Sequence, residues 1–313
     1  MIIREISSST ALGADYLKKI VRSASHRYKV YPIRKRTGGF REISQPSVEL
    51  KLLQRWLVDN VFSYFPVHES VYSYRKGLGI KNIAGLHKNK RYLLRVDFAD
   101  FFPSVKGVDV SNLVRKRAAL VPIRISEKDV KIIEAIVCKD GHLTIGAPSS
   151  PAITNAILYD FDRNFCEKAR SKGALYSRYA DDIYLSSNRK GVLSSLYREL
   201  RKDLKRLRRP RLTINEEKTV FSSRKHTRIV TGLYLTSDRK ISIGRRKKRF
   251  IKGMVHRYLE GKLDEKQIAY LRGFLSYVKG VEPNFLTRLR KKFGRKKIDE
   301  ILKAEIVCRK ENK

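Results

Sequence analysis

The sequence predicts an α+β fold in which helices pack on an antiparallel sheet and the chain ends in helices. Residues 174–187 hold two β-prone runs that meet at Ala180-Asp181-Asp182, where a tight hairpin turn would fall. Residues 93–105 include a second apolar run of the kind found in strands. Most other segments carry apolar residues at helical spacing, and from residue 245 onward the patterns are helical.

The N-terminal part predicts a helix, a hairpin and a second helix. Residues 10–25 have their apolar side chains on one side, as in a short amphipathic helix. Residues 31–43 form two strand-like runs around Gly38-Gly39, which suits a turn. Residues 47–62 carry an apolar helical stripe, and we expect Trp56 in the core.

Further elements follow the same patterns along the chain. Ser126 with Asp129 three residues later resembles a capping box, so Asp129 is expected on a helix surface. Asp160 and Asp162 are expected on the polar face of their helix. We expect helices over 109–120, 126–138, 150–168, 192–207, 245–259, 268–278 and 285–293, and a pair of edge strands over 228–235.

The charge balance predicts a polyanionic partner. The 313 residues include 70 Lys and Arg against 31 Asp and Glu, a net charge of +39. A compact chain with this self-repulsion is best explained by nucleic acid that neutralises it. Membrane binding is the competing reading, but no long apolar segment and no signal peptide is found. The three cysteines, Cys138, Cys166 and Cys308, are too scattered for a zinc site or disulfides, which suits a cytoplasmic protein.

Three aspartates form the candidate catalytic and metal site. Adjacent carboxylates such as Asp181 and Asp182 repel each other, and a divalent cation would relieve that repulsion. A solvated turn is the simpler reading of an isolated Asp-Asp pair. Asp97, however, lies inside an apolar strand, where an acid is excluded unless it is paired or metal-bound. The presence of Asp97 in addition to the Asp181-Asp182 pair therefore favours a metal site.

These segments resemble the motifs of reverse transcriptases. Tyr179-Ala180-Asp181-Asp182 is similar to their metal-binding box, residues 97–102 to their first palm motif, and residues 146–151 with Asn155 to their template-side motif. The resemblance implies a right-hand polymerase with fingers and thumb around the palm. It implies an N-terminal helix and fingers over 1–92, a palm with interleaved fingers helices over 93–235 and a helical thumb over 236–313.

The resemblance also assigns roles to other residues. Two Mg²⁺ ions would be held by Asp97, Asp181 and Asp182, and deoxynucleoside triphosphates would be the substrates. Phe102 matches the aromatic steric gate that excludes a ribose 2′-hydroxyl, although a core phenylalanine is the alternative. Nucleotide binding is expected at Lys35, Arg41, Phe98, Ala99, Asp100, Phe101, Phe102, Gly146 and Lys218.

Basic and aromatic residues are expected to hold the template and primer, because they stack on bases and neutralise phosphates. Tyr72, Arg75 and Lys76 have this composition, and the resemblance implies further contacts with template or primer at His87, Pro148, Ser149, Tyr179, Val230, Thr231, Gly232, Arg245, Arg246, Lys247, Lys248 and Arg249. For His87, an ordinary buried histidine is an equally good interpretation.

A further layer of resemblance points to the retron branch. Val230-Thr231-Gly232 is similar to the Val-Thr-Gly of retron enzymes, and Ala84 with His87 is similar to the end of their Asn-Ala-x-x-His element. This implies a cognate structured non-coding RNA as template, priming from a guanosine 2′-hydroxyl within it, and a branched multicopy RNA–DNA hybrid (msDNA). It also implies antiphage defence together with a separate effector protein.

Other functions remain open from the sequence. The chain could be a reverse transcriptase of the group II intron or diversity-generating kind, or an RNA-templated RNA polymerase. From another class, it could be an RNA-binding scaffold whose palm has lost activity. The intact set of three aspartates argues against the scaffold.

Nucleotide choice tests the role of Phe102. With the ring in place, we expect the purified protein to extend a primer with deoxynucleotides only. Phe102→Ala should admit ribonucleotides, because the space under the sugar opens. Primer extension with each nucleotide class measures this. If Phe102→Ala discriminates between deoxynucleotides and ribonucleotides as strongly as the wild type does, Phe102 has only a structural role.

Overall fold

The fold of the protein was taken from a computed structural model, which describes residues 1–35 and 38–303. Two compact units make up the chain. Unit 1 contains Met1–Gly79 and Tyr92–Phe221, and unit 2 contains Ile80–Arg91 and the chain from Ser222 onward. Because the units are interleaved along the sequence, the expected boundaries after residues 92 and 235 remain predictions. Arg36, Thr37 and Cys308 lie outside the described residues.

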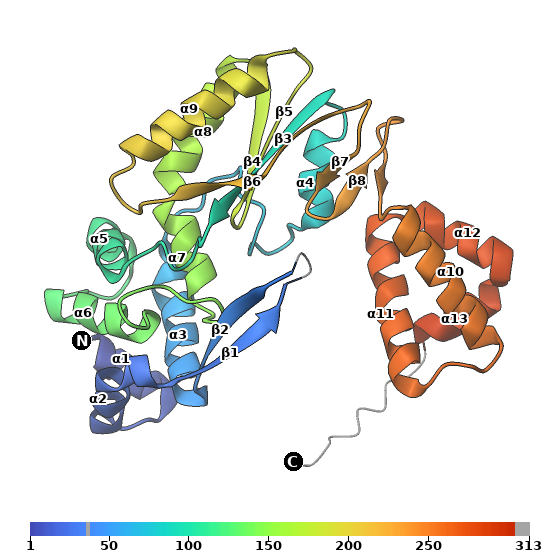
Figure 1. The fold of residues 1–313 in the computed structure, drawn as a ribbon. Helices are drawn as coiled ribbons and strands as arrows, with labels where there is room; N and C mark the ends of the chain where they lie inside the picture. The colour runs from blue at the N-terminus through green and yellow to red at the C-terminus, as the bar shows by residue number, and fades with distance from the viewer. Residues whose placement is uncertain (36–37, 304–313) are drawn as a thin grey trace. The chain divides into compact units, whose positions relative to one another are not determined.

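A four-stranded sheet forms the centre of unit 1 (Figure 1). Its strand order is β4-β5-β3-β6, and β5 pairs antiparallel with both β4 and β3. The predicted α+β class and the hairpin over 174–187 are therefore confirmed. The strands are β3 (Tyr92–Ala99), β4 (Ala174–Tyr179), β5 (Asp182–Ser187) and β6 (Thr213–Ser223).

The alternation of side chains along the strands gives the sheet an apolar face and a charged face. Leu94, Val96 and Phe98 of β3 and Ile183 and Leu185 of β5 are buried against two helices. These helices, α8 (Tyr159–Ser171) and α9 (Val192–Arg206), supply the rest of that core. The intervening residues of β3 and β5 therefore point to the opposite face, where the acids lie.

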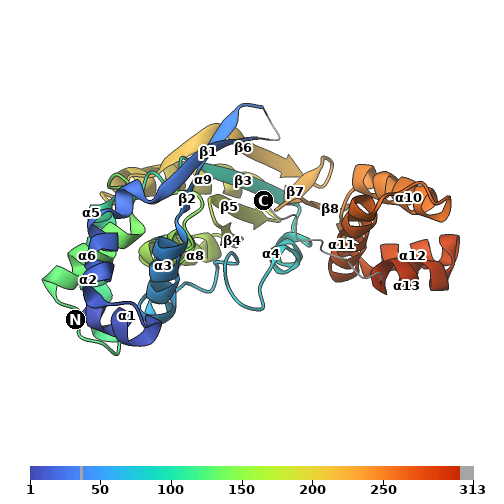
Figure 2. The same cartoon turned by 90° about the horizontal axis from the view of Figure 1, so that it is seen from below.

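The remainder of unit 1 is a helical cluster with a two-stranded hairpin. Figures 1 and 2 show these helices side by side, and their apolar residues form a second core. The hairpin strands β1 (Tyr28–Arg34) and β2 (Phe40–Pro46) pair antiparallel. The helices are α1 (Ile2–Thr10), α2 (Ala14–Arg22), α3 (Val48–Asn60), α5 (Gly107–Arg117), α6 (Glu127–Val137) and α7 (Ser150–Ile157), with 3₁₀ turns η1 (Ala24–His26), η2 (Phe62–Tyr64) and η3 (Ala118–Leu120).

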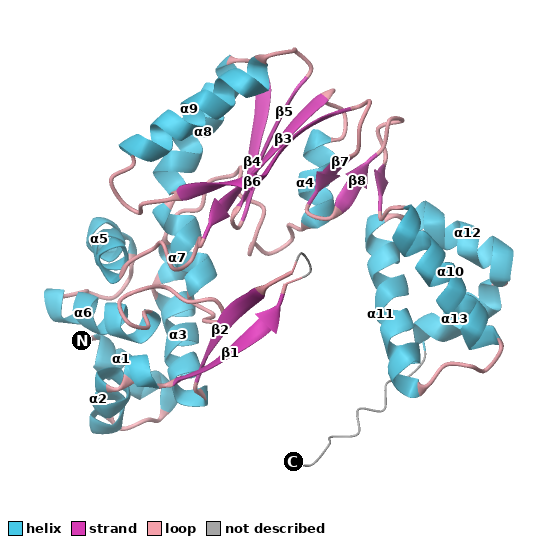
Figure 3. Cartoon of the chain, in the orientation of Figure 1, coloured by secondary structure: helices cyan, strands magenta, loops and turns pink. Residues whose placement is uncertain are grey.

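Unit 2 joins a small sheet to a set of helices (Figure 3). The sheet order is β7-β8-β9, and α4 (Ile80–His87) packs on it. Glu282 ties the sheet to the helices, since its carboxylate accepts from the Ile243 N–H at 3.0 Å and from Lys248 Nζ at 2.6 Å. The elements are β7 (Arg228–Val230), β8 (Leu233–Leu235), β9 (Ile241–Ser242), α10 (Arg245–Leu259), α11 (Glu265–Val281), α12 (Pro283–Phe293) and α13 (Arg295–Lys303).

Two predicted helices are broken in the structure. The helix expected over 10–25 is α2 alone, and an additional helix, α1, precedes it; Ala11 has φ +56° and separates the two. The helix expected over 150–168 divides at Leu158 into α7 and α8. Apolar spacing continues through both breaks, so periodicity alone did not reveal them. Among the described residues, no helix combines the length and apolarity needed to cross a bilayer.

Helical patterns placed two aspartates wrongly, while the tryptophan packs against the core as expected but is only partly buried. Asp129 is 1% exposed and accepts hydrogen bonds from the Ile2 N–H at 2.8 Å and the Ser126 N–H at 2.9 Å. Asp162 is completely buried opposite Arg178. Trp56 is only partly buried, and its Nε1 donates to Ser9 Oγ at 2.6 Å. Each of these side chains has a partner from a distant segment, which no local pattern shows.

Asp129 should stabilise the fold in a pH-dependent manner. Burial opposes its ionisation, but the hydrogen bonds from Ser126 and Ile2 outweigh burial and lower the pKa of Asp129 to about 2. We expect Asp129→Ala to lower the free energy of unfolding by about 1–2 kcal/mol at neutral pH. Because the folded-state pKa lies below the unfolded value, this difference should be lost as the pH falls through about 2.

Urea unfolding of the variant and the wild type measures this difference. Glu127→Ala removes a 68% exposed carboxylate from the same helical turn and serves as the control. A loss of stability as small as that of the control would contradict the structural role of Asp129.

Candidate active site

The pairing of β3 with β5 brings the predicted acids together. Asp97 stands directly across from Asp182 in the register of the two antiparallel strands, and Asp181 precedes Asp182 at the hairpin turn. The Phe98 N–H donates to the Asp181 carbonyl at 3.1 Å, which fixes the turn to β3. Asp97 is 4% exposed. The three acids therefore lie at one end of the charged face of the sheet.

Two cations and a hydroxyl compensate the acids. Lys218 of β6 places Nζ 3.0 Å from Asp97 Oδ1, and Arg95 Nε donates to Asp182 Oδ1 at 2.9 Å. The Tyr184 hydroxyl donates to Asp182 Oδ2 at 3.0 Å. Arg95 and Tyr184 face each other across the strands, as Asp97 and Asp182 do. Lys218 was expected to bind nucleotide; the structure places it beside Asp97, and nucleotide contact remains a prediction.

The compensation does not extend fully to Asp181. Burial, together with the negative charges of Asp182 and Asp97, raises the pKa of Asp181 to about 6. Arg41 of β2 opposes this rise only weakly. Burial also raises the pKa of Asp182, although Arg95 offsets part of the increase. The site thus holds more negative charge than its own side chains neutralise.

This donor set fits a hard divalent cation. Carboxylate oxygens are the ligands that Mg²⁺ prefers, and the elevated pKa of Asp181 marks a carboxylate that a cation would stabilise. Within residues 1–35 and 38–303, no three His, Cys, Asp or Glu side chains form a preassembled metal site. Mg²⁺ usually takes only one or two protein carboxylates and completes its shell with water and substrate phosphates, so a closed protein cage is not required.

The residues of the first palm motif divide between core and surface. Phe98 and Phe101 are 2% and 5% exposed and stack with ring centroids 5.7 Å apart, so their rings belong to the core, and nucleotide binding at these two residues remains a prediction. Ala99 and Phe102 are partly exposed, and Asp100 is exposed. Phe102 packs partly against both cores of unit 1, a position compatible with either of its interpretations.

Gly146 lies against the β1–β2 hairpin. A Cβ at this residue would come within 2.9 Å of the Ser44 carbonyl oxygen, and the backbone has φ +113°. The Ser44 N–H donates to the Ile145 carbonyl at 2.8 Å. Glycine is therefore needed for close packing on the hairpin that carries Lys35 and Arg41, both exposed. Nucleotide contact by these residues remains a prediction.

The expected RNA-binding residues of unit 1 differ in accessibility. Lys76 is exposed, and Tyr72, Pro148 and Tyr179 are partly exposed. Ser149 is fully buried, which contradicts its expected contact with RNA. Arg75 is partly exposed, and its Nη1 donates to the Val71 carbonyl at 3.0 Å, so it also stabilises its own loop.

In unit 2, two of the expected contacts are buried. His87 is fully buried, and burial, with the nearby Lys90, lowers its pKa to about 3, so the ring is neutral and enclosed. Val230 is also fully buried. Thr231 and Gly232 form the turn between β7 and β8 with φ +47° and +78°, as in a type I′ turn. The expectation of RNA contact is thus corrected for His87 and Val230 and kept for the turn.

The basic stretch at the start of α10 is largely accessible. Arg245, Arg246 and Arg249 are exposed. Lys248 forms an ion pair with Glu282, whereas Lys247 lies over the Tyr277 ring with Nζ 5.8 Å from its centroid. Backbone binding by this stretch remains a prediction.

Arg95 and Tyr184 were not predicted from the sequence. Arg95 lies two residues from Asp97 and Tyr184 two residues from Asp182, on the same face of their strands, and this alternation was the signal that could have identified them. An arginine inside an apolar strand also requires an acidic partner, as Asp97 requires a cationic one.

Comparison with known proteins finds reverse transcriptases both as the matching family and as the similar individual proteins. Residues 33–271 match the family described as reverse transcriptase (RNA-dependent DNA polymerase). The chain is 36% identical to the retron Ec83 reverse transcriptase of Escherichia coli, covering 90% of this chain and 91% of that protein. It is 32% identical to the retron Ec73 enzyme (92% and 93% covered) and 30% identical to the retron Ec86 enzyme (95% and 92%), both of Escherichia coli.

Solved structures show a weaker similarity. A foamy viral protease-reverse transcriptase in complex with double-stranded DNA has a TM-score of 0.49 and 16% identity, covering 88% of this chain and 43% of that chain.

The raised pKa of Asp181 predicts that its ionised carboxylate lowers the stability of the fold. Without divalent cations, ionised Asp181 destabilises the fold, so Asp181→Asn should raise the free energy of unfolding by up to about 2 kcal/mol at pH 8. The folded-state pKa lies above the unfolded value, so the gain should shrink as the pH falls through about 6 and vanish below about 4.

Denaturant unfolding in the presence of a chelator measures this gain, with Asp59→Asn, an exposed aspartate on α3, as the control. Unchanged or reduced stability of Asp181→Asn at pH 8 would show that Asp181 is fully compensated by its surroundings.

Proposed function

Because the chain belongs to the reverse transcriptase family, on the branch of the retron enzymes, we propose that this RNA-directed DNA polymerase copies a cognate structured non-coding RNA. The observation that carries the catalytic part of the proposal is the register of β3 and β5, which sets Asp97 opposite Asp182 beside Asp181. This arrangement needs no nucleophilic side chain, because phosphoryl transfer depends on positioning and charge neutralisation.

Asp97, Asp181 and Asp182 would hold two Mg²⁺ ions. When bound, the ions would lower the pKa of the primer hydroxyl and stabilise the charge of the departing pyrophosphate. Arg95 and Lys218 keep Asp182 and Asp97 oriented at hydrogen-bonding distance. Lys218 is 45% exposed at its side chain, so it can also meet an incoming phosphate.

The surroundings of the acids would select and orient the nucleotide. Lys35 and Arg41 on the β1–β2 hairpin would bind the triphosphate, and the influence of Arg41 on Asp181 supports its proximity to the site. Phe102 would act as the steric gate. Ala99, Asp100 and the exposed backbone of Gly146 would complete the nucleotide pocket.

Accessible residues in each unit would hold template and primer. In unit 1 these are Tyr72, Lys76, Pro148 and Tyr179. In unit 2 they are the Thr231-Gly232 turn and the basic start of α10. Contacts with the phosphate backbone are independent of sequence, whereas helix shape and unpaired bases would provide selectivity for one structured RNA.

The retron relatives support a specific product. We infer priming from the 2′-hydroxyl of a guanosine within the template RNA, which gives a branched RNA–DNA hybrid, and a role in antiphage defence with a separate effector protein in the cytoplasm. The net charge of +39 supports permanent association with such a polyanion.

Nucleic acid that copurifies with the protein from its native host tests this function. We expect a species sensitive to both ribonuclease and deoxyribonuclease, in which DNA is joined covalently to an internal RNA position. Linear cDNA alone would instead indicate an intron or diversity-generating type of enzyme.

A double variant links this product to the proposed site. Asp181→Ala with Asp182→Ala should retain the RNA and contain no DNA. Glu216→Ala with Glu217→Ala changes the net charge by the same amount on exposed residues of β6 and should retain both. DNA synthesis by the double aspartate variant would exclude these acids as ligands.

A further inference from the structure

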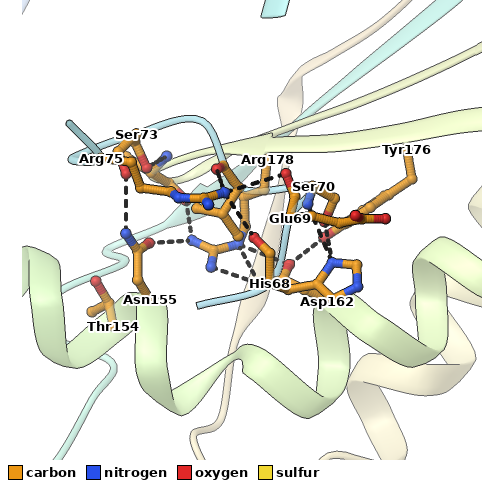
Figure 4. Close-up of polar contacts among 12 residues, drawn as sticks. His68, Glu69, Ser70, Ser73, Arg75, Thr154, Asn155, Asp162, Tyr176 and Arg178 are labelled. Atoms are coloured by element: carbon orange, nitrogen blue, oxygen red, sulfur yellow. Dashed lines mark hydrogen bonds and ion pairs between the residues drawn. The ribbon is translucent and has the colours of Figure 1, made fainter. Parts of the chain in front are cut away.

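The segment 68–75 lies beside β4 and is joined to it at Arg178. The Arg178 N–H donates to the Ser70 carbonyl, and the Tyr72 N–H donates to the Arg178 carbonyl, each at 2.9 Å. Val71 and Arg178 form a parallel bridge. Arg75 stabilises the other side of this segment through the carbonyls of His68, Glu69 and Val71. Figure 4 shows the segment next to the side chains that it contacts.

The side chain of Arg178 reaches the turn that contains Ala180. Arg178 is fully buried, and its Nη1 donates to the Ala180 carbonyl at 3.1 Å. The Asp162 carboxylate accepts hydrogen bonds from Arg178 Nε at 2.9 Å and from Arg178 Nη2 at 2.7 Å. Asn155 Oδ1 accepts from Arg178 Nη1 at 3.2 Å (Figure 4). Burial opposes the charge, but Asp162 outweighs burial and raises the pKa of Arg178. The guanidinium is therefore a fixed cation with a defined orientation.

Ala180 is held by side chains on both of its peptide groups. Its N–H donates to Ser73 Oγ at 2.8 Å, while its carbonyl accepts from Arg178. Ala180 has φ +55°, a conformation that residues with a Cβ rarely adopt and that persists only where the surroundings enforce it. Asn155 Nδ2 donates to the Ser73 carbonyl at 3.1 Å and keeps Ser73 in place. The turn that precedes Asp181 thus depends on the segment 68–75.

We propose that Ser73 and Arg178 are positioning residues for the polymerase reaction. They hold Ala180 in its left-handed conformation, so that Asp181 and Asp182 are presented to the metal ions, and they join this turn to the segment 68–75, which carries Tyr72. The proposal rests on the proposed function and adds to it a mechanical coupling: the segment 68–75 and the turn at Ala180 keep one relative position because Arg178 bonds to both.

The chemistry of the cluster supports positioning over simple packing. A buried ion pair is a poor source of stability, since apolar residues of the same volume would often do as well. The directional bonds of a guanidinium, however, can fix a carbonyl and a carboxylate at once. Ser73 is fully buried, and its hydroxyl serves the Ala180 N–H, one residue before a catalytic acid.

Ser73→Ala is the sharpest test, because it removes one hydroxyl and leaves the Arg178–Asp162 pair intact. Ser187→Ala is the matched control: Ser187 is a fully buried serine at the opposite end of the same β4–β5 hairpin. Primer extension on an annealed RNA template and DNA primer gives kcat and the KM for deoxynucleotides. The rise of the unfolding temperature with added Mn²⁺ gives an apparent metal affinity without turnover.

We expect Ser73→Ala to lower kcat about 10-fold and to weaken the apparent Mn²⁺ affinity roughly threefold or more, because the acids lose their fixed orientation. The KM for deoxynucleotides and the unfolding temperature without metal should match those of Ser187→Ala. A kcat and a Mn²⁺ affinity within about twofold of the control would overturn the proposal, and so would a loss explained entirely by a lower unfolding temperature.

Arg178→Lys keeps the charge but cannot bind Asp162 and Ala180 together, so it should reproduce the Ser73→Ala pattern more strongly. If this variant does not fold, Ser73→Ala still decides the question. If the wild type extends no primer, the proposed function fails, yet the difference in Mn²⁺ affinity between the two serine variants continues to test the positioning role.

Discussion

The register between β3 and β5 is the constraint on which the site depends. Because side chains alternate along a strand, a shift of one residue would move Asp97 into the apolar core beneath α8 and α9. The apolar residues Leu94, Val96 and Phe98 therefore do more than fill space, since their burial fixes which face carries the acids. Core packing and catalytic geometry are two results of one pairing.

This pairing concentrates negative charge, and the structure compensates it unevenly. Arg95, Tyr184 and Lys218 contact Asp97 and Asp182, while Asp181 is left with an elevated pKa. A site neutralised by its own cations would have little need for metal ions or phosphates. The incomplete compensation gives the enzyme a place where added positive charge is favourable, at a cost in stability when no cation is bound.

The sequence allowed the cluster of three aspartates to be predicted because its signals are local and unusual. An acid within an apolar strand and an acid pair at a hairpin turn identified Asp97, Asp181 and Asp182, and the hairpin itself is confirmed. These local signals could not predict burial that depends on partners distant in the sequence. Asp162 meets Arg178 from another segment, and Asp129 meets Ile2, so helical periodicity assigned both wrongly to the surface. Ser149 is also buried, and of the two interpretations of His87 the buried histidine fits the structure.

The close packing of Gly146 on Ser44 also affects how the β1–β2 hairpin can move. The hairpin is attached near its base by the Ser44 N–H, and the missing side chain at Gly146 leaves no gap there. The displacement of a hairpin that is attached near its base increases with distance from the point of attachment. Arg41, only three positions from the fastening, would travel a short arc, while Lys35, beyond the Arg34–Phe40 pair, would travel a longer one. The two cations of the hairpin would then differ in how firmly the backbone holds them, Arg41 more and Lys35 less.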